Sequence, residues 1–284
     1  MITRNRPEFA RPLLQSVSAA LNTHNRLDAR WLVGLASGLD SPVMSHQNIC
    51  LTPAQESRLA MLINQRNAGL PISRMRGKRE FWSLDFYLNA ATLDPRPDSE
   101  TLISAALGYA QNALAQNSQP RILDLGCGSG CLLLSLLSEL DQASGVGIDR
   151  APLAVAQARA NAAALGLAGR AHIQTGNWAE GLEERYHLIL SNPPYICDAD
   201  DSLSDEVRLH DPSAALFAGA DGLSAYRSLL PQLGAILAPE GQAFLEVGCG
   251  QIEAVGELAQ DAGLTVIQVY KDLAGIERCL SVAK

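Results

Sequence analysis

The sequence predicts an α/β protein with a mostly parallel sheet, preceded by a small helical domain. From Arg121 onward, short apolar runs alternate with longer Ala- and Leu-rich segments, a pattern typical of a sheet with helices on both faces. Before about residue 80, Ala-, Leu- and Gln-rich segments recur between turn signals and favour helices. With 284 residues, the chain has the length of about two domains.

Three helices are expected in the first part of the chain, near Ala10–Asn22, Arg26–Leu39 and Pro53–Ala68. We expect Thr52 to cap the third helix, with Pro53 at its first position, and Gly69–Pro71 to end it. This part contains no catalytic pattern. We interpret residues 1–80 as a helical substrate-recognition domain.

The segment that follows predicts a hairpin. Residues 81–88 alternate in polarity and are rich in aromatic side chains, which favours a strand. Residues 90–93 are expected to pair with that strand. We therefore assign residues 81–94 as a hairpin linker and residues 95–284 as the larger α/β domain.

The loop Pro95–Glu100 contains two prolines and should be rigid and non-helical. We expect Ser99 or Asp98 to cap a helix over residues 101–116. The simplest interpretation of this loop is a stiff helix cap, and the functional alternative is a cover over a bound cofactor.

Beyond this loop, seven strands are expected near 121–124, 145–149, 171–174, 186–191, 241–247, 264–270 and 277–282. Helices are expected near 130–140, 151–165, 223–237 and 251–262. Only Lys271–Ile276 separates the last two strands, which is too short for a helical crossover and predicts an antiparallel pair. Ligands of such sheets bind at the carboxyl ends of the strands.

The stretch Asn192–Tyr195, Asn-Pro-Pro-Tyr, is the most informative part of the chain. It follows an apolar strand, and the strand must end there because proline cannot donate a hydrogen bond to a sheet. The amide of Asn192 can accept hydrogens from an NH2 group, and the ring of Tyr195 can cover its flat face. These residues indicate a pocket for a planar nitrogen. An ordinary strand-ending loop is the alternative.

A glycine-rich turn follows the strand at 121–124, and its residues are Gly126, Cys127, Gly128, Ser129 and Gly130. Its glycines let the backbone adopt positive φ angles and approach a ligand closely. Asp149 lies 19 positions after Gly130 and ends the next strand, a spacing that suits a carboxylate bound to ribose hydroxyls. A helix cap is the competing role for Asp149. NAD, FAD and S-adenosylmethionine sites all use turns of this kind.

The net charge of −8 and the pI of about 5.1 argue against a nucleic-acid partner, because such proteins usually carry a basic surface. We interpret the basic stretch Arg74–Arg79 as a solvated connector, with an acidic partner or RNA as the alternative. No stretch reaches the roughly 20 apolar residues of a membrane span. The first residues have no apolar signal core, so we expect a cytoplasmic protein without membrane association.

The six cysteines are scattered, without a C-x-x-C pair or a Cys/His cluster of zinc-ligand spacing. We therefore expect reduced, mostly buried thiols and no metal site. Cys197 lies just after the Pro-Pro turn, but no histidine is placed beside it in a pattern typical of a nucleophile. The histidines are interpreted as structural or surface residues.

The motifs together resemble those of the class I S-adenosylmethionine-dependent methyltransferases and, within them, the release-factor glutamine methyltransferase (PrmC/HemK) family. The segments that carry the resemblance are Arg79–Trp82, Pro95–Glu100, Asp124–Gly126, Asn192–Ile196, Asp221–Leu223, Leu245–Gly248 and Asp272–Gly275. The resemblance implies a seven-stranded Rossmann-like domain. It also implies methylation of the glutamine side-chain amide in the Gly-Gly-Gln loop of peptide chain release factors, with S-adenosylhomocysteine as the second product.

By motif matching, the cofactor contacts fall on Gly126–Gly130, Asp149, Trp178 and Asn192. Substrate contacts fall on Asn192, Pro193, Pro194 and Tyr195, and we expect Asn192, Pro193 and Tyr195 to act in catalysis. Trp178 could equally be a core residue on the sequence pattern alone, and a core aromatic is also the alternative for Tyr195. Asn177 stands where the family commonly has Asp, and Asp211 where it has Glu.

An amide nitrogen is a weak nucleophile, and no strong base is evident near Asn192. We therefore expect catalysis by positioning and electrostatics. Three alternative functions involve other substrates or cofactors. They are glutamine methylation of a ribosomal protein, amino-methylation of adenine or guanine in nucleic acid, and hydride transfer with a nicotinamide cofactor. A non-catalytic protein that binds S-adenosylmethionine is a fourth alternative.

Overall fold

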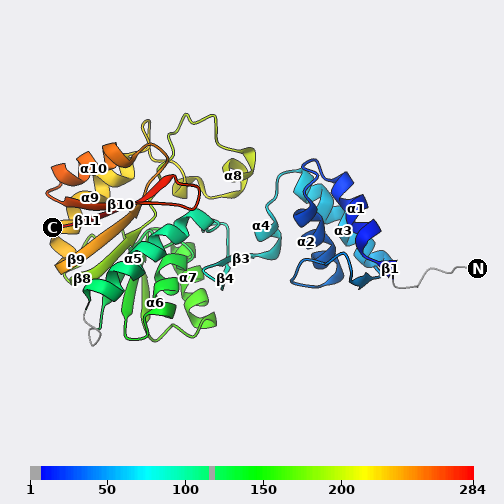
Figure 1. Cartoon of the computed structure of the whole chain (residues 1–284), viewed down its shortest axis with the longest axis horizontal. Helices are drawn as coiled ribbons and strands as arrows, with labels where there is room; N and C mark the ends of the chain where they lie inside the picture. Colours follow the sequence, from blue (N-terminus) through cyan, green and yellow to red (C-terminus); the bar gives the residue numbers. More distant parts are fainter. Residues whose placement is uncertain (1–7, 115–118) are drawn as a thin grey trace, which may run out of the picture. The chain divides into compact units, whose positions relative to one another are not determined.

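The computed structural model describes residues 8–114 and 119–284. By its internal contacts the chain divides into two compact units (Figure 1). The first unit comprises Met1–Gly77 and Ser204–His210, and the second comprises Lys78–Leu203 and Asp211–Lys284. A short segment from the distal part of the sequence therefore packs with the N-terminal residues.

The first unit is helical, as the sequence predicts. Its elements are α1 (Arg11–Ala20), α2 (Arg26–Ser37), α3 (Pro53–Asn67), α4 (Ile72–Arg76), α8 (Asp205–His210) and a two-residue strand pair, β1 (Glu8–Phe9) with β2 (Asn48–Ile49). Buried aliphatic side chains of α1, α2 and α3 form a separate core, which includes Val17, Leu32 and Leu62. This core is what makes the unit compact independently of the sheet.

The start of α3 confirms the predicted cap. The Thr52 hydroxyl accepts a hydrogen bond from the backbone N–H of Gln55, and the Gln55 side chain accepts one from the backbone of Thr52. Pro53 occupies the first turn, where its missing N–H costs nothing. The helix ends at Asn67, shortly before Gly69, whose φ of +91° lies in the left-handed region.

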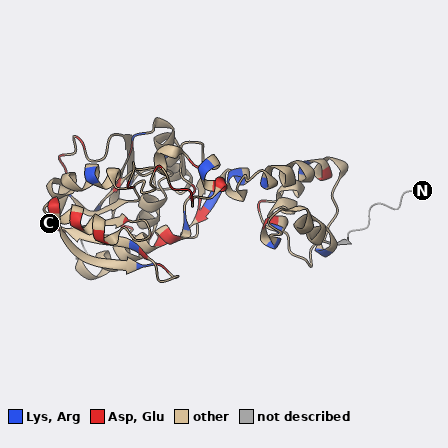
Figure 2. Cartoon of the chain, turned by 90° about the horizontal axis from the view of Figure 1, so that it is seen from above, with Lys and Arg blue, Asp and Glu red and all other residues tan. Residues whose placement is uncertain are grey.

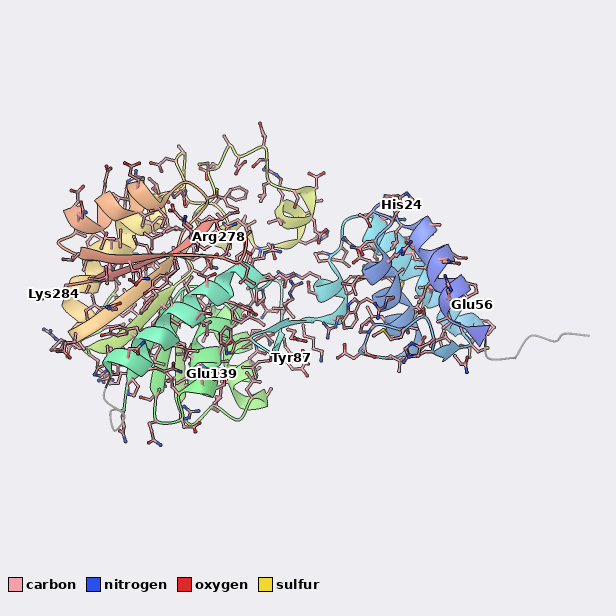
Figure 3. The ribbon with its side chains drawn as sticks, viewed as in Figure 1. His24, Glu56, Tyr87, Glu139, Arg278 and Lys284 are labelled. Atoms are coloured by element: carbon pink, nitrogen blue, oxygen red, sulfur yellow. The ribbon has the colours of Figure 1, made fainter. Side chains whose placement is uncertain are left out.

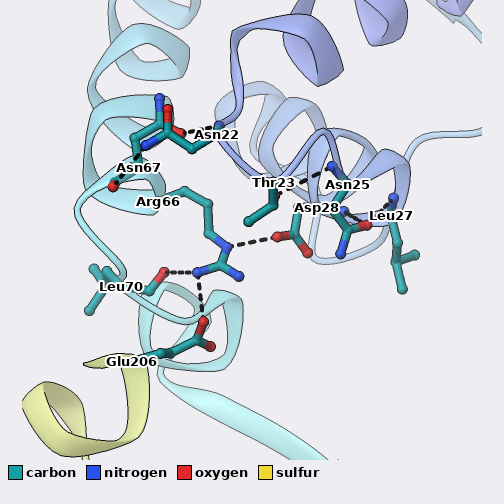
Figure 4. A network of polar contacts seen from close by, with 9 residues as sticks. All are labelled: Asn22, Thr23, Asn25, Leu27, Asp28, Arg66, Asn67, Leu70 and Glu206. Atoms are coloured by element: carbon teal, nitrogen blue, oxygen red, sulfur yellow. Dashed lines mark hydrogen bonds and ion pairs between the residues drawn. The ribbon is translucent and has the colours of Figure 1, made fainter. Parts of the chain in front are cut away.

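Arg66, near the end of α3, connects three parts of the helical unit (Figure 4). Its Nε donates to Asp28 of α2 at 2.7 Å, and its Nη1 donates to Glu206 of α8 at 3.0 Å. The same Nη1 lies 3.5 Å from the carbonyl oxygen of Leu70. The side chains of Arg66 and Asp28 are about one-tenth exposed. A buried charge is costly unless it is paired, and here the guanidinium pairs with two carboxylates. This pairing explains why α8 packs with the N-terminal residues.

The predicted hairpin is present, but it is built differently. The strands are β3 (Lys78–Phe81) and β4 (Leu84–Tyr87), so the chain reverses inside the stretch predicted as one strand. Trp82 and Ser83 form the turn, with φ values of +51° and +58°. Local sequence gives no signal for this turn, because such angles favour Asn or Gly. Long-range hydrogen bonds hold it: the backbone N–H of Trp82 donates to Glu100, and its indole N–H donates to Glu139.

The second unit contains a seven-stranded sheet that agrees with the predicted strands. The strands are β5 (Arg121–Leu125), β6 (Ser144–Asp149), β7 (Ala171–Thr175), β8 (Tyr186–Ser191), β9 (Leu237–Glu246), β10 (Thr265–Lys271) and β11 (Glu277–Ala283). Their order is β10-β11-β9-β8-β5-β6-β7. All pairs are parallel except those of β11 with β9 and β10, which confirms the predicted antiparallel hairpin at the end.

Helices cover both faces of this sheet (Figure 1). They are α5 (Glu100–Ala113), preceded by a 3₁₀ turn (Pro97–Ser99), α6 (Cys131–Glu139), α7 (Pro152–Ala164), α9 (Ser224–Ile236) and α10 (Ile252–Asp261). Residues from α5, α6 and α7 share one core cluster, and residues from α9 and α10 share another. Residues 115 and 116 of the predicted helix lie outside the described residues. The described helices include none long and apolar enough to cross a membrane.

Acidic partners accompany the basic stretch at residues 74–79. Arg76 lies over the Trp31 ring and donates to Asp40. Lys78 donates to Asp85 across the β3–β4 hairpin, where acidic and basic residues lie side by side (Figure 2). The side chains of Arg76 and Lys78 are only 11% and 14% exposed, so the expectation of a solvated stretch is wrong for these two residues.

Asp124 in β5 is fully buried in the sheet, and burial raises the pKa of its carboxyl from 3.8 to about 7. One oxygen accepts the backbone N–H of Leu133 at 3.2 Å, which opposes that rise, while Oδ1 has no hydrogen bond among the described residues. The folded protein therefore binds this proton more tightly than the unfolded chain does. Its contribution to stability is present below about pH 4 and is lost as the pH rises through about 7.

The first prediction concerns this carboxyl. Asp124→Asn removes the buried charge, so the variant should gain unfolding free energy relative to the wild type as the pH rises from 4 to 8, by up to about 4 kcal/mol. Urea unfolding of both proteins at the two pH values measures the change. A difference between them that stays constant with pH would contradict the proposed burial cost.

Candidate functional site

A cavity of about 380 Å³ lies at the carboxyl ends of β5, β6 and β8. Its lining includes the glycine-rich turn, Asp149, Trp178, Asn192 and Pro194, together with residues of two loops, 90–99 and 212–215. The buried Ser191 hydroxyl donates to the Leu125 carbonyl at 2.7 Å, which joins the ends of β8 and β5. Parallel pairing therefore brings together motifs that lie more than 60 positions apart in the sequence.

The glycine-rich turn adopts the conformation for which glycine is needed. Gly126, Gly128 and Gly130 have φ values of +77°, +55° and +81°, where a side chain would be strained. A Cβ on Gly130 would approach Leu134 and Ala158 to 3.1 and 3.3 Å. A Cβ on Gly128 would meet nothing within 4 Å. Gly130 thus permits close packing, and Gly128 presents bare backbone at the cavity.

Asp149 accepts two backbone N–H groups, and α7 itself has no side-chain cap, so the expected helix-cap role is not the one observed. Its Oδ2 accepts the N–H of Gly128 at 2.9 Å, and its Oδ1 accepts the N–H of Ala151, at the start of α7, at 2.8 Å. Each carboxylate oxygen can accept a second hydrogen bond. The carboxylate therefore holds the glycine turn against α7 and can still bind hydroxyl groups in the cavity.

Trp178 lines the cavity beside the glycine turn. Its backbone has a φ of +48°, and a Cβ on Gly126 would lie 3.5 Å from its ring. The ring also packs against the core cluster of α9 and α10. The same side chain therefore contributes to the core and forms part of the cavity wall. The neighbouring Asn177 also lines the cavity, and its amide donates to Glu180.

Asn192 lines the cavity at the end of β8, and its Nδ2 donates to the Ser99 hydroxyl at 3.2 Å. The prediction that Ser99 or Asp98 caps α5 is wrong, because that helix has no side-chain cap. Ser99 has helical backbone angles, φ −66° and ψ −15°, whereas a capping residue needs extended ones. Its buried hydroxyl is instead engaged by Asn192.

The rest of the Asn-Pro-Pro-Tyr motif divides between cavity and core. Pro194 lines the cavity, Pro193 is buried, and Tyr195 packs against the core cluster of α9 and α10. The Tyr195 hydroxyl donates to Oε1 of Glu246 at 3.2 Å, and its carbonyl accepts from Gln251 at 2.9 Å. Burial, with the nearby Glu246 charge, raises the pKa of Tyr195 well above its usual value. Its phenol therefore stays protonated near neutral pH.

Glu246 was given no role in the sequence analysis, where it appears only within the motif Leu245–Gly248. It ends β9, is 1% exposed, and lies beside Tyr195. Burial raises the pKa of its carboxyl to about 7, although Ser99 and Tyr195 act to lower it. An acidic residue at the carboxyl end of a central strand was the available signal.

An ion pair that the sequence analysis did not predict joins the two loops that line the cavity. Arg96, which lines the cavity, pairs with Asp211, and Asp211 also accepts the backbone N–H of Asp94 at 3.2 Å. Arg150 donates to the carbonyl oxygen of Ala214 at 3.1 Å. The Asp at position 211 thus performs an anchoring role despite its short side chain.

Two cysteines, Cys127 and Cys131, line the cavity. Burial raises the pKa of Cys127 well above its usual value and that of Cys131 to about 12, so both thiols stay protonated. No group of three or more His, Cys, Asp or Glu side chains in the described ranges could hold a metal ion. The cavity therefore offers a carboxylate, an aromatic face, bare backbone and an oriented amide.

Comparison with known proteins agrees with this arrangement. The family model described as "Methyltransferase small domain" matches residues 108–210. A methyltransferase structure from Pyrococcus furiosus covers 77% of this chain and 98% of its own, with a TM-score of 0.52 and 16% identity. That similarity supports the fold described above, a seven-stranded sheet with helices on both faces.

Sequence comparison with curated relatives identifies the family. A release factor glutamine methyltransferase from Bradyrhizobium diazoefficiens is 44% identical over 277 residues, 96% of this chain and 93% of the relative. Another, from Rhodospirillum rubrum, is 47% identical over 257 residues, 90% of this chain and 78% of the relative. With this identity over nearly its whole length, the chain belongs to the release factor glutamine methyltransferase family.

Proposed function

We propose that this enzyme transfers a methyl group from S-adenosylmethionine to the side-chain amide nitrogen of the glutamine in the Gly-Gly-Gln motif of peptide chain release factors. The products are N5-methylglutamine, S-adenosylhomocysteine and a proton. The observation that carries this proposal is the 44% identity with a release factor glutamine methyltransferase over 96% of the chain. The intact Asn192–Tyr195 motif at the cavity supports it.

The cavity fits S-adenosylmethionine by the chemistry of its lining. Asp149 keeps lone pairs for the ribose hydroxyls, Trp178 offers a flat apolar face for adenine, and Gly128 lets the backbone approach the ligand. We assign Gly126–Gly130 and Asn192 to the same binding surface. The bound cofactor supplies an electrophilic methyl group on a positively charged sulfur.

The residues of this chain then have to orient a weak nucleophile. We propose that the Asn192 side-chain oxygen and the Pro193 carbonyl accept the two N–H hydrogens of the glutamine amide, and that the Tyr195 ring packs on the amide plane. Pro194 completes the substrate contact. Orienting two reactants in this way can lower the barrier by ~7–11 kcal/mol relative to free encounter. The N–C bond forms as the S–C bond breaks, and the methylated nitrogen, made acidic by its positive charge, then loses one proton to water, so no strong base is required.

We further propose that the helical unit recognises the substrate protein away from the modified loop, as a substrate-recognition domain, and that the enzyme acts in the cytoplasm. The unit has its own core and lacks the motifs of the cavity. A short peptide that carries only the Gly-Gly-Gln loop should therefore have a higher KM than the intact release factor. Equal KM values for peptide and protein would remove the basis for this role.

The assay that tests the function compares substrates of different classes. Labelled methyl transfer from S-adenosylmethionine to purified release factor is expected, with no label on tRNA, rRNA, DNA or ribosomal protein. Replacing the target glutamine of the release factor should abolish the signal. Label on nucleic acid alone would overturn the proposal in favour of base amino-methylation, which the net charge of −8 disfavours.

A second prediction separates the roles of Asn192. Asn192→Ala should lower kcat by roughly 100-fold or more, since the hydrogen-bond acceptor that orients the nucleophile is lost. The Kd for S-adenosylmethionine, measured by calorimetry, should rise by a much smaller factor than kcat falls, because other residues of the cavity also bind the cofactor. Equal losses in rate and in cofactor affinity would argue against a role in orienting the amide.

The third prediction concerns Asp149. Asp149→Ala removes the carboxylate from the cavity and frees the N–H groups of Gly128 and Ala151, so cofactor Kd should rise by roughly 10-fold or more. Calorimetric titration with S-adenosylhomocysteine measures this without turnover. Unchanged binding in the folded variant would exclude Asp149 from the cofactor site.

A further inference from the structure

Two residues outside the Asn-Pro-Pro-Tyr motif, Ser99 and Glu246, connect its first and last members. Asn192 Nδ2 donates to the Ser99 hydroxyl at 3.2 Å, and the Tyr195 hydroxyl donates to Glu246 Oε1 at 3.2 Å. The Ser99 hydroxyl is also a neighbour of the Glu246 carboxyl and acts to lower its pKa. Ser99 is 2% exposed and Glu246 1% exposed, so water does not replace these contacts.

The direction of these hydrogen bonds follows from the number of hydrogens available. An ionised carboxylate only accepts hydrogen bonds, whereas a serine hydroxyl has one hydrogen to donate and two lone pairs. When the Ser99 hydrogen points to Glu246, its lone pairs are left to accept the N–H of Asn192. The nitrogen end of the Asn192 amide is then committed to Ser99, which leaves the oxygen end for another donor.

We propose that Ser99 and Glu246 are positioning residues that hold the Asn192 amide with its oxygen available to the substrate. This inference rests on the proposed function, since it concerns how a glutamine NH2 group is accepted. If the amide turned by half a rotation, its own NH2 group would face the substrate NH2 group, and two donors cannot bond to each other. The same carboxylate anchors Tyr195, so a single buried group orients both the amide and the ring.

The surroundings of Glu246 keep it available for this role. Arg278 of β11 (Figure 3) is close enough to act on it electrostatically, but it forms an ion pair with Asp98 at 3.1 Å and donates a hydrogen bond to Asp272 at 3.0 Å. Tyr226 donates to the Glu246 backbone carbonyl, not to the side chain. Oε2 of Glu246 has no hydrogen-bond partner among the described residues.

The ionisation of Glu246 makes the arrangement sensitive to pH. A protonated carboxyl can donate to Ser99, whose own hydrogen is then free to bond the Asn192 oxygen, so the orientation of the amide is no longer fixed. Since the carboxyl has a pKa of about 7, kcat should rise between pH 6 and 8. The other ionisable groups around it are Asp98, Cys131, Tyr195, Tyr226, Arg278 and Cys279. Raised pKa values keep the thiols and phenols protonated, and Asp98 is paired with Arg278.

The test uses the full-length enzyme with Ser99→Ala and Glu246→Gln, which keep the size of the side chains nearly unchanged. Each should lower kcat on release factor by roughly 10- to 100-fold, because a buried hydrogen bond that orients the amide is lost. The Kd for S-adenosylmethionine should change by less than about threefold. Glu246→Gln should also flatten the rise of kcat between pH 6 and 8.

Ser135→Ala is the matched control, because Ser135 is equally buried but its hydroxyl makes no hydrogen bond in the described chain. Its kcat should equal that of the wild type. The double variant Ser99→Ala with Glu246→Gln should be no slower than the slower single variant, since both act through Asn192. If Glu246→Gln fails to fold, Ser99→Ala against Ser135→Ala decides the question.

Outcomes for this inference and for the proposed function are distinct. A wild-type enzyme without activity on release factor would contradict the function, whatever the variants do. An active wild type whose Ser99→Ala variant keeps a normal kcat would overturn the positioning role alone. The same conclusion would follow if the fold-losses in kcat of the two single variants multiplied in the double variant. Multiplying losses mean that the two residues act independently and not both through Asn192.

Discussion

The parallel pairing of β5 with β6 on one side and with β8 on the other is the constraint on which the site depends. Asp124 of β5 lies level with Gly147 of β6 and with Leu190 of β8, so the three strands end at the same edge. The glycine-rich turn, Asp149 and Asn192 each follow one of these ends. A sheet of alternating β-α units places such ends together whatever the length of chain between them.

This arrangement buries polar groups, which is unfavourable unless they form hydrogen bonds. In this structure single side chains form hydrogen bonds with more than one element or join two strands. Asp149 accepts N–H groups from the glycine turn and from the start of α7, and Ser191 joins β8 to β5. Asp124 and Glu246 keep an oxygen without a hydrogen bond among the described residues. Burial raises the pKa of both carboxyls to about 7, so each is near its charge change at neutral pH. Groups of this kind concentrate at functional sites.

Much of the fold followed from local patterns. All seven strands of the large sheet and the terminal antiparallel pair were predicted, because buried strands have continuous apolar runs and short connections exclude crossovers. The turn at Trp82 and Ser83 was missed, because only contacts with Glu100 and Glu139 stabilise its positive φ angles. The role of Ser99 was missed for a related reason: a serine before a helix normally caps it, and its true partner lies 93 positions away.

Local sequence was sufficient to establish the α/β class, the motif at Asn192–Tyr195 and the glycine-rich turn, because strand periodicity, proline and glycine act on the backbone within a few residues. It contained no information on which side chain would meet Asn192 or Tyr195. That depended on the order of strands in the sheet, which places the end of β9 beside the end of β8 and so brings the Glu246 carboxyl to the Tyr195 hydroxyl. Hydrogen bonds between distant residues form only after the sheet has set their distance and direction.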